Sequence, residues 1–434
     1  MSRNPIRQLD DRLINQIAAG EVIERPASLL KELLENSVDA GATRISIQAE
    51  RGGIKRIRIT DNGHGIPRDE LELALSRHAT SKLQRFDDLF NVSTLGFRGE
   101  ALPSISAVSR LSIASRALDG DSGYLAECHG GSQVSEPQPL AHATGTTVEV
   151  SDLFFNTPAR RKFLKTEKTE LKHLQDVVRR MALSCFDVAI DFSHNSRQVL
   201  AVSAANTPAE REKRIAGICG NSFANQSVYI EDNAGPMILE GWIGLPAFSR
   251  TQRDMQFFFV NGRAVKDNLI AHAVRRAYSD VLFHGRHPAF VLFFKIEPRL
   301  VDVNVHPAKT EVRFRETRAV HDYIYRCLHR AIATMTPEQS RVELPGPKEG
   351  VNTGVEEQYS SSERSRRGFG SLQSQQNIRM LVEEQLHAYS RFQNHEAPPH
   401  SSYEGSQELE QSEIPPMGFA IAQLKGVYIL AENR

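Results

Sequence analysis

A carboxylate and a carboxamide stand four residues apart in the segment ERPASLLKELLENSVDAG, as Glu32 and Asn36. At about 100° per residue a helix places both on one side with Asp39, while leucines cover the other. A glutamate and an asparagine so spaced can hold a water molecule and a Mg²⁺ ion on adjacent turns. A solvated polar face is the alternative interpretation. The helix dipole argues against it, because Glu35 and Asp39 lie in the last turns, where an anion costs up to about 1 kcal/mol.

A second carboxylate, Asp61, ends the strand-like stretch IKRIRIT and begins DNGHGIP. Ile57 and Ile59 alternate with polar residues, so Asp61 is expected on their side of the strand, facing the interior. A buried carboxylate needs hydrogen-bond donors, and the amino group of adenine with a bound water would satisfy it. Gly63 and Gly65 would let the backbone approach a flat ring. An Asx turn that caps the strand is the alternative interpretation.

Two loops have the composition of an anion-binding site. RHATSKL supplies Lys82, and STLGFRGEALPSI supplies Arg98 between Gly96 and Gly99, just before an expected helix start. Backbone N–H groups of a glycine loop and of a helix N-terminus attract anions. A flexible surface loop is the alternative, although the apolar letters LGF are unusual for one.

Two further segments combine strands with basic residues. GTTVEVSDLFFNTPARRKFL predicts a strand from Thr146, followed by a basic helix that Thr157 caps and that Arg160–Lys162 open. VDVNVHPAKTEVRF predicts two strands joined by a turn that carries Lys309. Exposure to water is the ordinary interpretation of both. Lys309 gains a role if its turn reaches the phosphate site of another domain.

The scaffold that must position these residues mixes strands and helices. Strand-like alternation recurs up to Met335, and helices are expected at 26–40, 68–78, 168–183, 267–281 and 319–334. This mixture indicates an α/β or α+β architecture. A domain boundary is expected near SAANTPAERE, where Pro208 follows a polar turn and starts a new helix.

Composition excludes several classes of protein. The 434 residues suit two or three domains, and 53 basic against 53 acidic residues exclude a histone-like nucleic-acid binder, so any DNA contact needs a local basic patch. The four cysteines form no C-x-x-C pair, which argues against a zinc ribbon and fits a reducing cytosol. The start is too polar for a signal peptide, and no apolar run is long enough for a membrane span. Without a Gly-Lys dipeptide, a P-loop is excluded.

The character of the chain changes from Pro337 onward. The segment is rich in Ser, Gln, Glu, Gly and Pro, and it has too little apolar surface to offset its ordering entropy, so a disordered linker is expected. It leads into GFAIAQLKGVYILAENR, a strand-like pair. A single hairpin has nothing to pack against, so we expect the chain to be a fragment of a longer protein.

Eight motifs in order resemble the MutL family of DNA mismatch-repair proteins: NQIAAGEVIERPASLLKELLENSVDAGAT, RITDNGHGI, RHATSK, LGFRGEAL, GTTVEV, LFFNTPARRKFL, FFFVNGR and VDVNVHPAKTEVRF. That family belongs to the GHKL ATPases, which also include DNA gyrase and the sensor histidine kinases. The resemblance runs from Leu9 to Met335. GFRGEAL and the terminal segment disfavour another GHKL enzyme such as a topoisomerase. Intact Glu32, Asn36 and Asp61 disfavour a scaffold with a decayed nucleotide site.

The resemblance implies an α+β fold in four parts. Residues 1–206 would form a GHKL (Bergerat-type) α/β sandwich ATPase domain with an N-terminal dimerisation arm. Residues 207–335 would form a transducer domain like domain 2 of ribosomal protein S5. Residues 336–414 would be the linker, and residues 415–434 would begin a C-terminal dimerisation domain.

The resemblance also assigns roles in slow, Mg²⁺-dependent ATP hydrolysis. Glu32 would be the general base, Asn36 the Mg²⁺ ligand and Asp61 the reader of the adenine amino group. The other implied ATP-binding residues are Gly63, Gly65, Ile66, Thr80, Ser81, Lys82, Leu95, Gly96, Phe97, Arg98, Gly99, Glu100, Ala101, Leu102, Thr146 and, at the γ-phosphate, Lys309. Of these, Gly96 to Leu102, with Thr80, Ser81 and Lys82, would form a lid over the phosphates.

The implied partners are DNA, a MutS-type mismatch sensor, a downstream nuclease and helicase, and a second copy of the chain. Dimerisation would depend on ATP at the N-terminal domain and be constitutive through the C-terminal domain. The setting would be the bacterial cytoplasm, at the nucleoid. Candidates for non-specific contact with the DNA backbone are Arg160, Arg161, Lys162, Arg263, Lys266, Arg275 and Arg276. Solvated helix faces are an equal alternative for these arginines and lysines.

Overall fold

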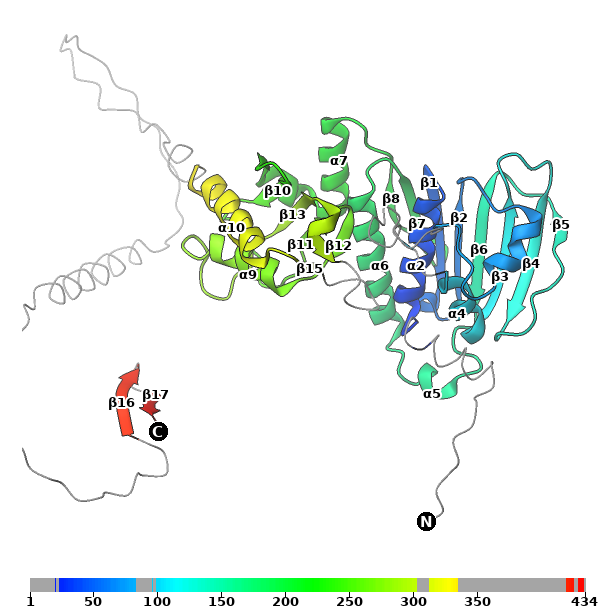
Figure 1. Cartoon of the computed structure of the whole chain (residues 1–434), viewed down its shortest axis with the longest axis horizontal. Coiled ribbons are helices and arrows are strands. Elements are labelled where there is room, and N and C mark those ends of the chain that lie inside the picture. The colour runs from blue at the N-terminus through cyan, green and yellow to red at the C-terminus, as the bar shows by residue number, and fades with distance from the viewer. Residues whose placement is uncertain are drawn as a thin grey trace, which may run out of the picture. The chain divides into compact units, whose positions relative to one another are not determined.

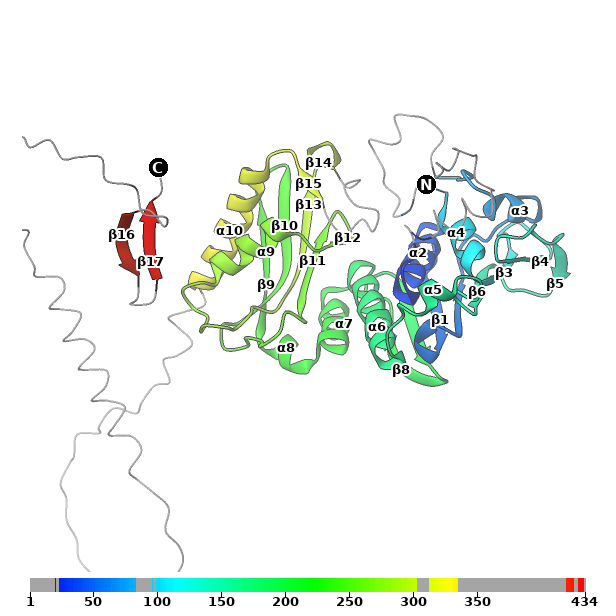
Figure 2. The ribbon, with the colours of Figure 1, turned by 90° about the horizontal axis from the view of Figure 1, so that it is seen from below.

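The computed structural model describes residues 20, 23–82, 96, 99–302, 312–334, 419–424 and 428–432. The chain divides into two compact units, Met1–Gly346 and Pro347–Arg434. The first unit contains an eight-stranded and a five-stranded sheet, each with helices, as Figures 1 and 2 show. This confirms the expected α+β class.

The eight-stranded sheet is almost entirely antiparallel. Its strand order is β5-β4-β3-β6-β2-β1-β7-β8, and only β1 and β7 run parallel. Its strands are β1 (Arg44–Glu50), β2 (Arg56–Asp61), β3 (Arg110–Arg116), β4 (Gly123–His129), β5 (Gln138–Leu140), β6 (Gly145–Ser151), β7 (Ala189–His194) and β8 (Arg197–Val202).

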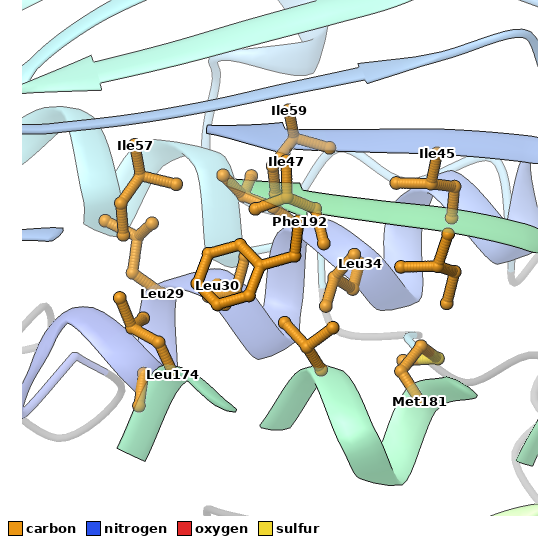
Figure 3. Close-up of a cluster of buried hydrophobic side chains, with 14 of the residues drawn as sticks. Leu29, Leu30, Leu34, Ile45, Ile47, Ile57, Ile59, Leu174, Met181 and Phe192 are labelled. Carbon is orange, nitrogen blue, oxygen red and sulfur yellow. The ribbon is translucent and has the colours of Figure 1, made fainter. Parts of the chain in front are cut away.

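Helix α2 (Pro26–Asp39) has the boundaries that its sequence predicts to within a residue. Pro26 occupies the first turn, where its missing N–H costs nothing. Gly41 takes φ +70° directly after the helix, a left-handed conformation that suits glycine. The predicted apolar side is buried, and Figure 3 shows Leu29 and Leu30 of α2 directed at the strands.

Helix α6 (Glu167–Ser184) packs beside α2 and completes the core on that face of the sheet. Leu174 and Met181 come from α6, and Ile47, Ile59 and Phe192 come from the strands, in the cluster of Figure 3. These strand residues are at most 1% exposed. Full burial of one such side chain contributes about 1.5–3 kcal/mol, so this layer fixes the position of α2 over β2.

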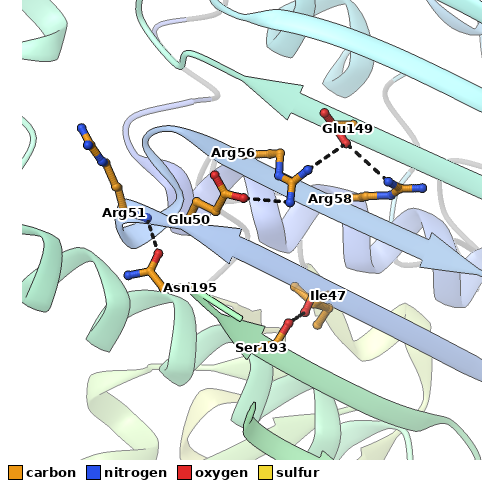
Figure 4. A network of polar contacts seen from close by, with 8 residues as sticks. All are labelled: Ile47, Glu50, Arg51, Arg56, Arg58, Glu149, Ser193 and Asn195. Atoms are coloured by element: carbon orange, nitrogen blue, oxygen red, sulfur yellow. Dashed lines mark hydrogen bonds and ion pairs between the residues drawn. The ribbon is translucent and has the colours of Figure 1, made fainter. Parts of the chain in front are cut away.

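Strand β2 alternates as its sequence predicts. Ile57, Ile59 and Asp61 are buried on the helix side, while Arg56 and Arg58 face outward. Figure 4 shows the outward network: Arg56 contacts Glu50 at 2.8 Å, and both arginines lie 3.8 Å from Glu149. In the same view Asn195 accepts a hydrogen bond from the N–H of Arg51, and Ser193 donates to the carbonyl of Ile47.

The five-stranded sheet has the order β12-β11-β13-β10-β9, with β11 and β13 parallel. Helices α9 (Asn268–Ala277) and α10 (Thr317–Thr334) pack together on one of its faces, as Figure 2 shows. Its strands are β9 (Ser227–Asn233), β10 (Met237–Gly244), β11 (Gln256–Val260), β12 (Arg263–Val265) and β13 (Phe290–Ile296).

Strand β11 of this second sheet is buried on both faces, which explains its continuous apolar run. Phe258 belongs to the core under α9 and α10, whereas Phe257 and Phe259 belong to the core that includes α6. Phe186, just after α6, lies 5.7 Å from Phe293 between ring centroids. Strands covered on both sides read as unbroken apolar segments rather than as alternating ones.

Helix α7 (Pro208–Cys219) begins at the predicted proline. Thr207 caps it: the threonine side chain accepts from the N–H of Glu210, whose carboxylate accepts from the N–H of Thr207. Arg214 then reaches back to the end of α6, where Nε donates to the carbonyl of Ala182 at 2.9 Å and Nη2 to that of Cys185 at 3.0 Å. Nη1 also donates to the carbonyl of Val188 at 2.8 Å.

Two helix predictions were wrong in detail. The expected helix at 68–78 is a 3₁₀ turn, Arg68–Glu70, followed by α3 (Leu71–Ala74); His78, at φ +60°, has a left-handed backbone that no helix contains. The basic helix α5 is only Pro158–Arg161, and Thr157 precedes it without a side-chain capping bond. The remaining elements are α4 (Ala101–Val108), α8 (Asn221–Asn225), β14 (Val301–Asp302), β15 (Arg313–Phe314) and the 3₁₀ turns Arg51–Gly53 and Pro298–Leu300.

In the second unit, β16 (Phe419–Leu424) and β17 (Tyr428–Glu432) pair antiparallel, as the sequence predicts. The expected linker, residues 336–414, lies outside the described residues. Among the residues that the structure describes, no helix is both long and apolar enough to cross a membrane.

Candidate functional site

Asp61 lies at the end of β2, buried beneath the C-terminal part of α2, and is 8% exposed. Ser37 Oγ donates to its Oδ2 at 2.9 Å. The N–H groups of Gly63 and Thr146 donate to Oδ1 at 3.0 and 3.3 Å. The bond from Gly63 is an Asx turn, so that alternative also holds. An ionised carboxylate has about four acceptor positions, and a further donor such as an amino group therefore fits beside these three.

The electrostatics of Asp61 also favour a further donor. Burial is the largest influence and raises the pKa of its carboxyl group, against the lowering effect of the bonds from Gly63, Ser37 and Thr146. The charged form is thus incompletely compensated by the protein. A ligand amino group would stabilise it.

The glycines after Asp61 have a packing reason of their own. A Cβ at Gly63 would lie 2.6 Å from the carbonyl oxygen of Ala40, and one at Gly65, at φ +71°, would overlap the carbonyl of Arg116. The turn is held there because His64 N donates to Ala40 O at 3.0 Å. These close approaches fix the turn against α2 and β3. A role for the glycines beside a ligand ring stays a prediction.

A buried hydroxyl joins the predicted Ile66 and Thr146. Ser115 of β3 is fully buried; its Oγ accepts from the N–H of Ile66 at 2.8 Å and donates to the carbonyl of Gly145 at 3.0 Å. It also lies 2.9 Å from Thr146 Oγ1. The structure therefore brings Asp61, Ile66 and Thr146 together.

Sequence reasoning missed both serines of this network. Ser37 had a signal, because it follows Leu30, Leu33 and Leu34 at helical spacing and so places a hydroxyl on the buried side of α2. Ser115 had no such signal, because it is only a polar residue in a largely apolar strand.

Lys82, which belongs to the predicted lid, contacts the polar side of α2. Its Nζ donates to Asn36 Oδ1 at 2.8 Å and to Asp39 Oδ2 at 2.6 Å. The N–H of Gly96 donates to the same Asp39 oxygen at 3.0 Å. Asn36, Lys82 and Gly96 therefore meet, as predicted for one site. Asp39, to which sequence reasoning gave no separate role, is the residue that connects them.

The amide oxygen of Asn36 is of the kind that Mg²⁺ takes as a ligand. Asn36 Oδ1 already faces a cationic group, the ammonium of Lys82. Over the described part of the chain, no cluster of three or more His, Cys, Asp or Glu side chains is arranged to hold a metal. Mg²⁺ takes oxygen ligands, keeps several water molecules and is commonly completed by substrate phosphates, so few protein ligands are needed. Glu32 is half-buried one helical turn before Asn36, on the same side of α2.

The described residues of the predicted lid lie around this point. Lys82 N donates to Thr80 Oγ1 at 3.1 Å, beside Ser81. A Cβ at Gly99, at φ +62°, would overlap the carbonyl of Ala79, so the two lid segments are in contact. Glu100 Oε1 lies 3.4 Å from His78 Nδ1, and α4 then begins at Ala101 and Leu102. The other predicted members, Leu95, Phe97, Arg98 and Lys309, lie outside the described residues.

The basic candidates do not form one patch. Arg161 and Lys162 are exposed and Arg160 is half-buried, all at α5. Burial lowers the pKa of the half-buried Arg263, and Glu35 and Asp39 of α2 lie near enough to oppose that effect.

Three further candidates lie apart. Lys266 contacts Asp176 at 3.5 Å. Arg276 lies over the ring of Tyr325, 4.9 Å from its centroid. Arg275, its exposed neighbour on α9, lines a small pocket instead.

Comparison with known proteins gives consistent matches along the chain. Residues 24–140 match the family described as "Histidine kinase-, DNA gyrase B-, and HSP90-like ATPase", and residues 215–333 match "DNA mismatch repair protein, C-terminal domain". The DNA mismatch repair protein MutL of Cellvibrio japonicus is 50% identical over 99% of this chain and 71% of its own length. That of Pseudomonas putida is 50% identical over 99% and 72%.

Solved structures agree. The crystal structure of the N-terminal domain of a DNA repair protein superimposes with a TM-score of 0.63 at 26% identity, covering 74% of this chain and 98% of that one. A mutant of the Aquifex aeolicus MutL ATPase domain gives 0.50 at 25% identity, covering 71% and 99%. The GHKL fold that the motifs imply is thereby confirmed.

Proposed function

The chain belongs to the MutL family of DNA mismatch-repair proteins, and from that premise we propose that its first unit binds ATP and slowly hydrolyses it with Mg²⁺. One observation supports this most strongly. Asp61 is a buried carboxylate that holds three donors at the end of β2 and fits one more. An adenine amino group is a donor of the right kind for that position.

The phosphates would extend from Asp61 toward the polar side of α2. Lys82 and the N–H of Gly96 both meet Asp39 there. Phosphate oxygens would compete with Asn36 and Asp39 for the Lys82 ammonium, because charge-assisted bonds to phosphate are strong. Binding would therefore draw the lid segment from α2 onto the nucleotide. Lys309, from the second domain, would reach the γ-phosphate.

Hydrolysis needs a positioned base and a cradle for charge. Glu32, one turn before Asn36 on the half-buried side of α2, would orient the attacking water and take its proton. Asn36 would hold the Mg²⁺ ion, which neutralises charge on the phosphates when bound. Donors from Lys82 and from the lid backbone would stabilise the charge that develops on the transferred group.

We further propose that ATP acts chiefly as a switch. Ordering of loops by a γ-phosphate is a general device. Closure of the lid and of the N-terminal arm would pair two copies of residues 1–206, while residues 207–335 transmit the change. The dimer would hold DNA through its backbone phosphates and couple a MutS-type sensor to a nuclease and a helicase in the bacterial cytoplasm.

The test is phosphate release from ATP, with and without DNA, by the chain and by Glu32→Ala. The variant should bind a non-hydrolysable ATP analogue normally and lose hydrolysis by at least about 10²-fold. Glu127→Ala is the control, because it removes an exposed carboxylate of β4. Phosphate release that is equal in Glu32→Ala and the unaltered chain would remove Glu32 from the mechanism.

A further inference from the structure

A small pocket opens at one end of the five-stranded sheet, away from the elements that carry Asp61. Its wall contains Arg253 from the turn before β11, Arg275 from α9 and His287 from the segment before β13. Figure 2 shows α9 beside α10 against this sheet. Three side chains that can carry positive charge thus converge from three separate elements.

The backbone around this pocket is held firmly. His287 N donates to Arg250 O at 2.7 Å, and Arg250 N donates to His287 O at 2.8 Å. Gln256 Nε2 donates to the carbonyl of Pro288 at 3.0 Å. The segment that carries His287 is therefore fixed to both the turn and the strand beside it, and a ligand would meet a preformed wall.

The charge in the pocket has one sign. Among the described residues that line it, none is Asp or Glu. The carboxylate next to Arg253 in the chain, Asp254, is bonded by Arg250 at 2.6 Å. A larger cavity of about 150 Å³ between α2, α6 and β12 differs, because its cations alternate with acids: Asp176 there contacts Arg180 at 3.0 Å and Lys266 at 3.5 Å.

The size of the pocket limits its ligand. Its volume of about 10 Å³ is close to that needed by one water molecule. It accepts one or two oxygens of an anion and does not enclose a small molecule. The matching group is an anionic oxygen presented at the surface of a larger molecule, as on a nucleic-acid backbone.

We propose that Arg253, Arg275 and His287 bind a phosphate of the DNA backbone. This rests on the proposed DNA engagement and assigns it a definite contact. The proposal gives different roles to two neighbours on α9. Arg275 lines the pocket, whereas the guanidinium of Arg276 lies over the ring of Tyr325. Arg275 is thus the specific contact of the pair.

His287 gives this contact a dependence on pH. Burial, then Arg253 and Arg275, lower the pKa of its imidazole. Two other cations lie near His287 in the fold or the chain, and both have partners: Arg250 donates to Asp254, and Arg286 donates to Ser249. A phosphate between the two arginines would favour the protonated imidazole. Binding would then take up a proton, so the affinity for DNA rises as pH falls and declines as the bound imidazole loses its proton.

The test is fluorescence anisotropy of a labelled duplex with the full chain, Arg275→Gln and Arg276→Gln over a series of salt concentrations. Both variants lose one charge from α9. Arg275→Gln should weaken binding about 3- to 10-fold and reduce the slope of log K against log salt by about 0.9, the value for one phosphate contact. Arg276→Gln should change affinity less than about 2-fold. Equal losses in the two variants would overturn the proposal.

His287→Gln provides the second arm, at pH 6.0 and 7.5. The unaltered chain should gain more affinity for DNA at the lower pH than this variant does; identical gains would contradict the role of the imidazole. Inorganic phosphate at matched ionic strength distinguishes a free anion from the backbone: millimolar phosphate that binds the unaltered chain but not Arg275→Gln, and that leaves the affinity for DNA unchanged, would reject the backbone assignment. If the unaltered chain bound no DNA, the proposed DNA engagement itself would fail.

Discussion

Replacement of Asp61 by asparagine separates binding from folding. The amide has nearly the same shape, so its oxygen can keep the bonds from Gly63 N and Thr146 N, while its NH₂ group faces Ser37 Oγ, which can turn to accept. Burial raises the pKa of Asp61, so the ionised form is disfavoured in the folded state. We expect Asp61→Asn to be as stable as the unaltered chain at pH 7, or more stable.

The pH dependence follows from the sign of that pKa shift. A carboxyl group whose pKa is raised by folding destabilises the fold above its unfolded pKa of about 3.9. The effect disappears where the group is protonated in both states. Any advantage of Asp61→Asn in urea unfolding should therefore be present at pH 7 and vanish as the pH falls below about 4.

The affinity for ATP should fall sharply. The variant loses a hydrogen bond from the adenine amino group to a charged acceptor, about 1.5–3 kcal/mol, and leaves a buried donor unsatisfied, about 1–3 kcal/mol. Together these predict a loss of about 2.5–6 kcal/mol, or about 10²- to 10⁴-fold in Kd. Isothermal titration with a non-hydrolysable ATP analogue and Mg²⁺ measures it.

Inosine triphosphate sharpens the test, because its base carries a carbonyl where adenine carries the amino group. The new amide NH₂ can donate to that carbonyl, so the preference for adenine over hypoxanthine should fall at least about 10-fold in Asp61→Asn. An ATP affinity within about threefold of the unaltered chain would refute the assignment of Asp61. Loss of folding would instead mean that the carboxylate supports the structure.

Three further predictions concern the contacts around this site. Ser37→Ala removes the donor to Asp61 Oδ2 and should weaken ATP binding about 3- to 10-fold in the same titration; an unchanged Kd would show that the hydroxyl does not position the carboxylate. Lys82→Met should weaken binding of ATP about 10-fold or more while sparing adenosine, since Lys82 contacts the α2 side where phosphates are proposed; equal losses for both ligands would contradict this. Arg214→Met leaves the carbonyls of Ala182, Cys185 and Val188, at and just after the end of α6, without their donor and should cost about 3–5 kcal/mol in urea unfolding, at about 1–3 kcal/mol for each unsatisfied group. Burial lowers the pKa of Arg214 to about 10, so the unaltered side chain is charged at neutral pH, and a cost below about 1 kcal/mol would show that its bonds are not needed.

Much of the fold follows from local patterns. The apolar periodicity and the residues typical of helix ends predicted helices α2, α6, α7, α9 and α10. Each of them buries an apolar side and begins or ends at a residue suited to that place. Strands β4, β5, β8, β9 and β12 were not predicted. All of them except β4 are edge strands, and each leaves several side chains exposed or only partly buried. Their residues therefore do not alternate clearly between apolar and polar, and their places depend on a partner strand.

The site divides in the same way. The interior position of Asp61 follows from the alternation of β2, and the placement of Asn36 follows from the period of α2. The bonds from Lys82 to Asn36 and Asp39 join residues 46 and 43 positions apart. No local pattern encodes such a contact, nor the burial of Ser115 between β3 and β6. These depend on how the sheet brings distant segments together.

The most direct measurement is a crystal structure of the chain with Mg²⁺ and a non-hydrolysable ATP analogue. We predict the adenine amino group within hydrogen-bond distance of the Asp61 carboxylate, the metal on Asn36 Oδ1, and the Lys82 ammonium moved from Asp39 to a phosphate. A nucleotide bound elsewhere, or one whose base makes no contact with Asp61, would contradict the account.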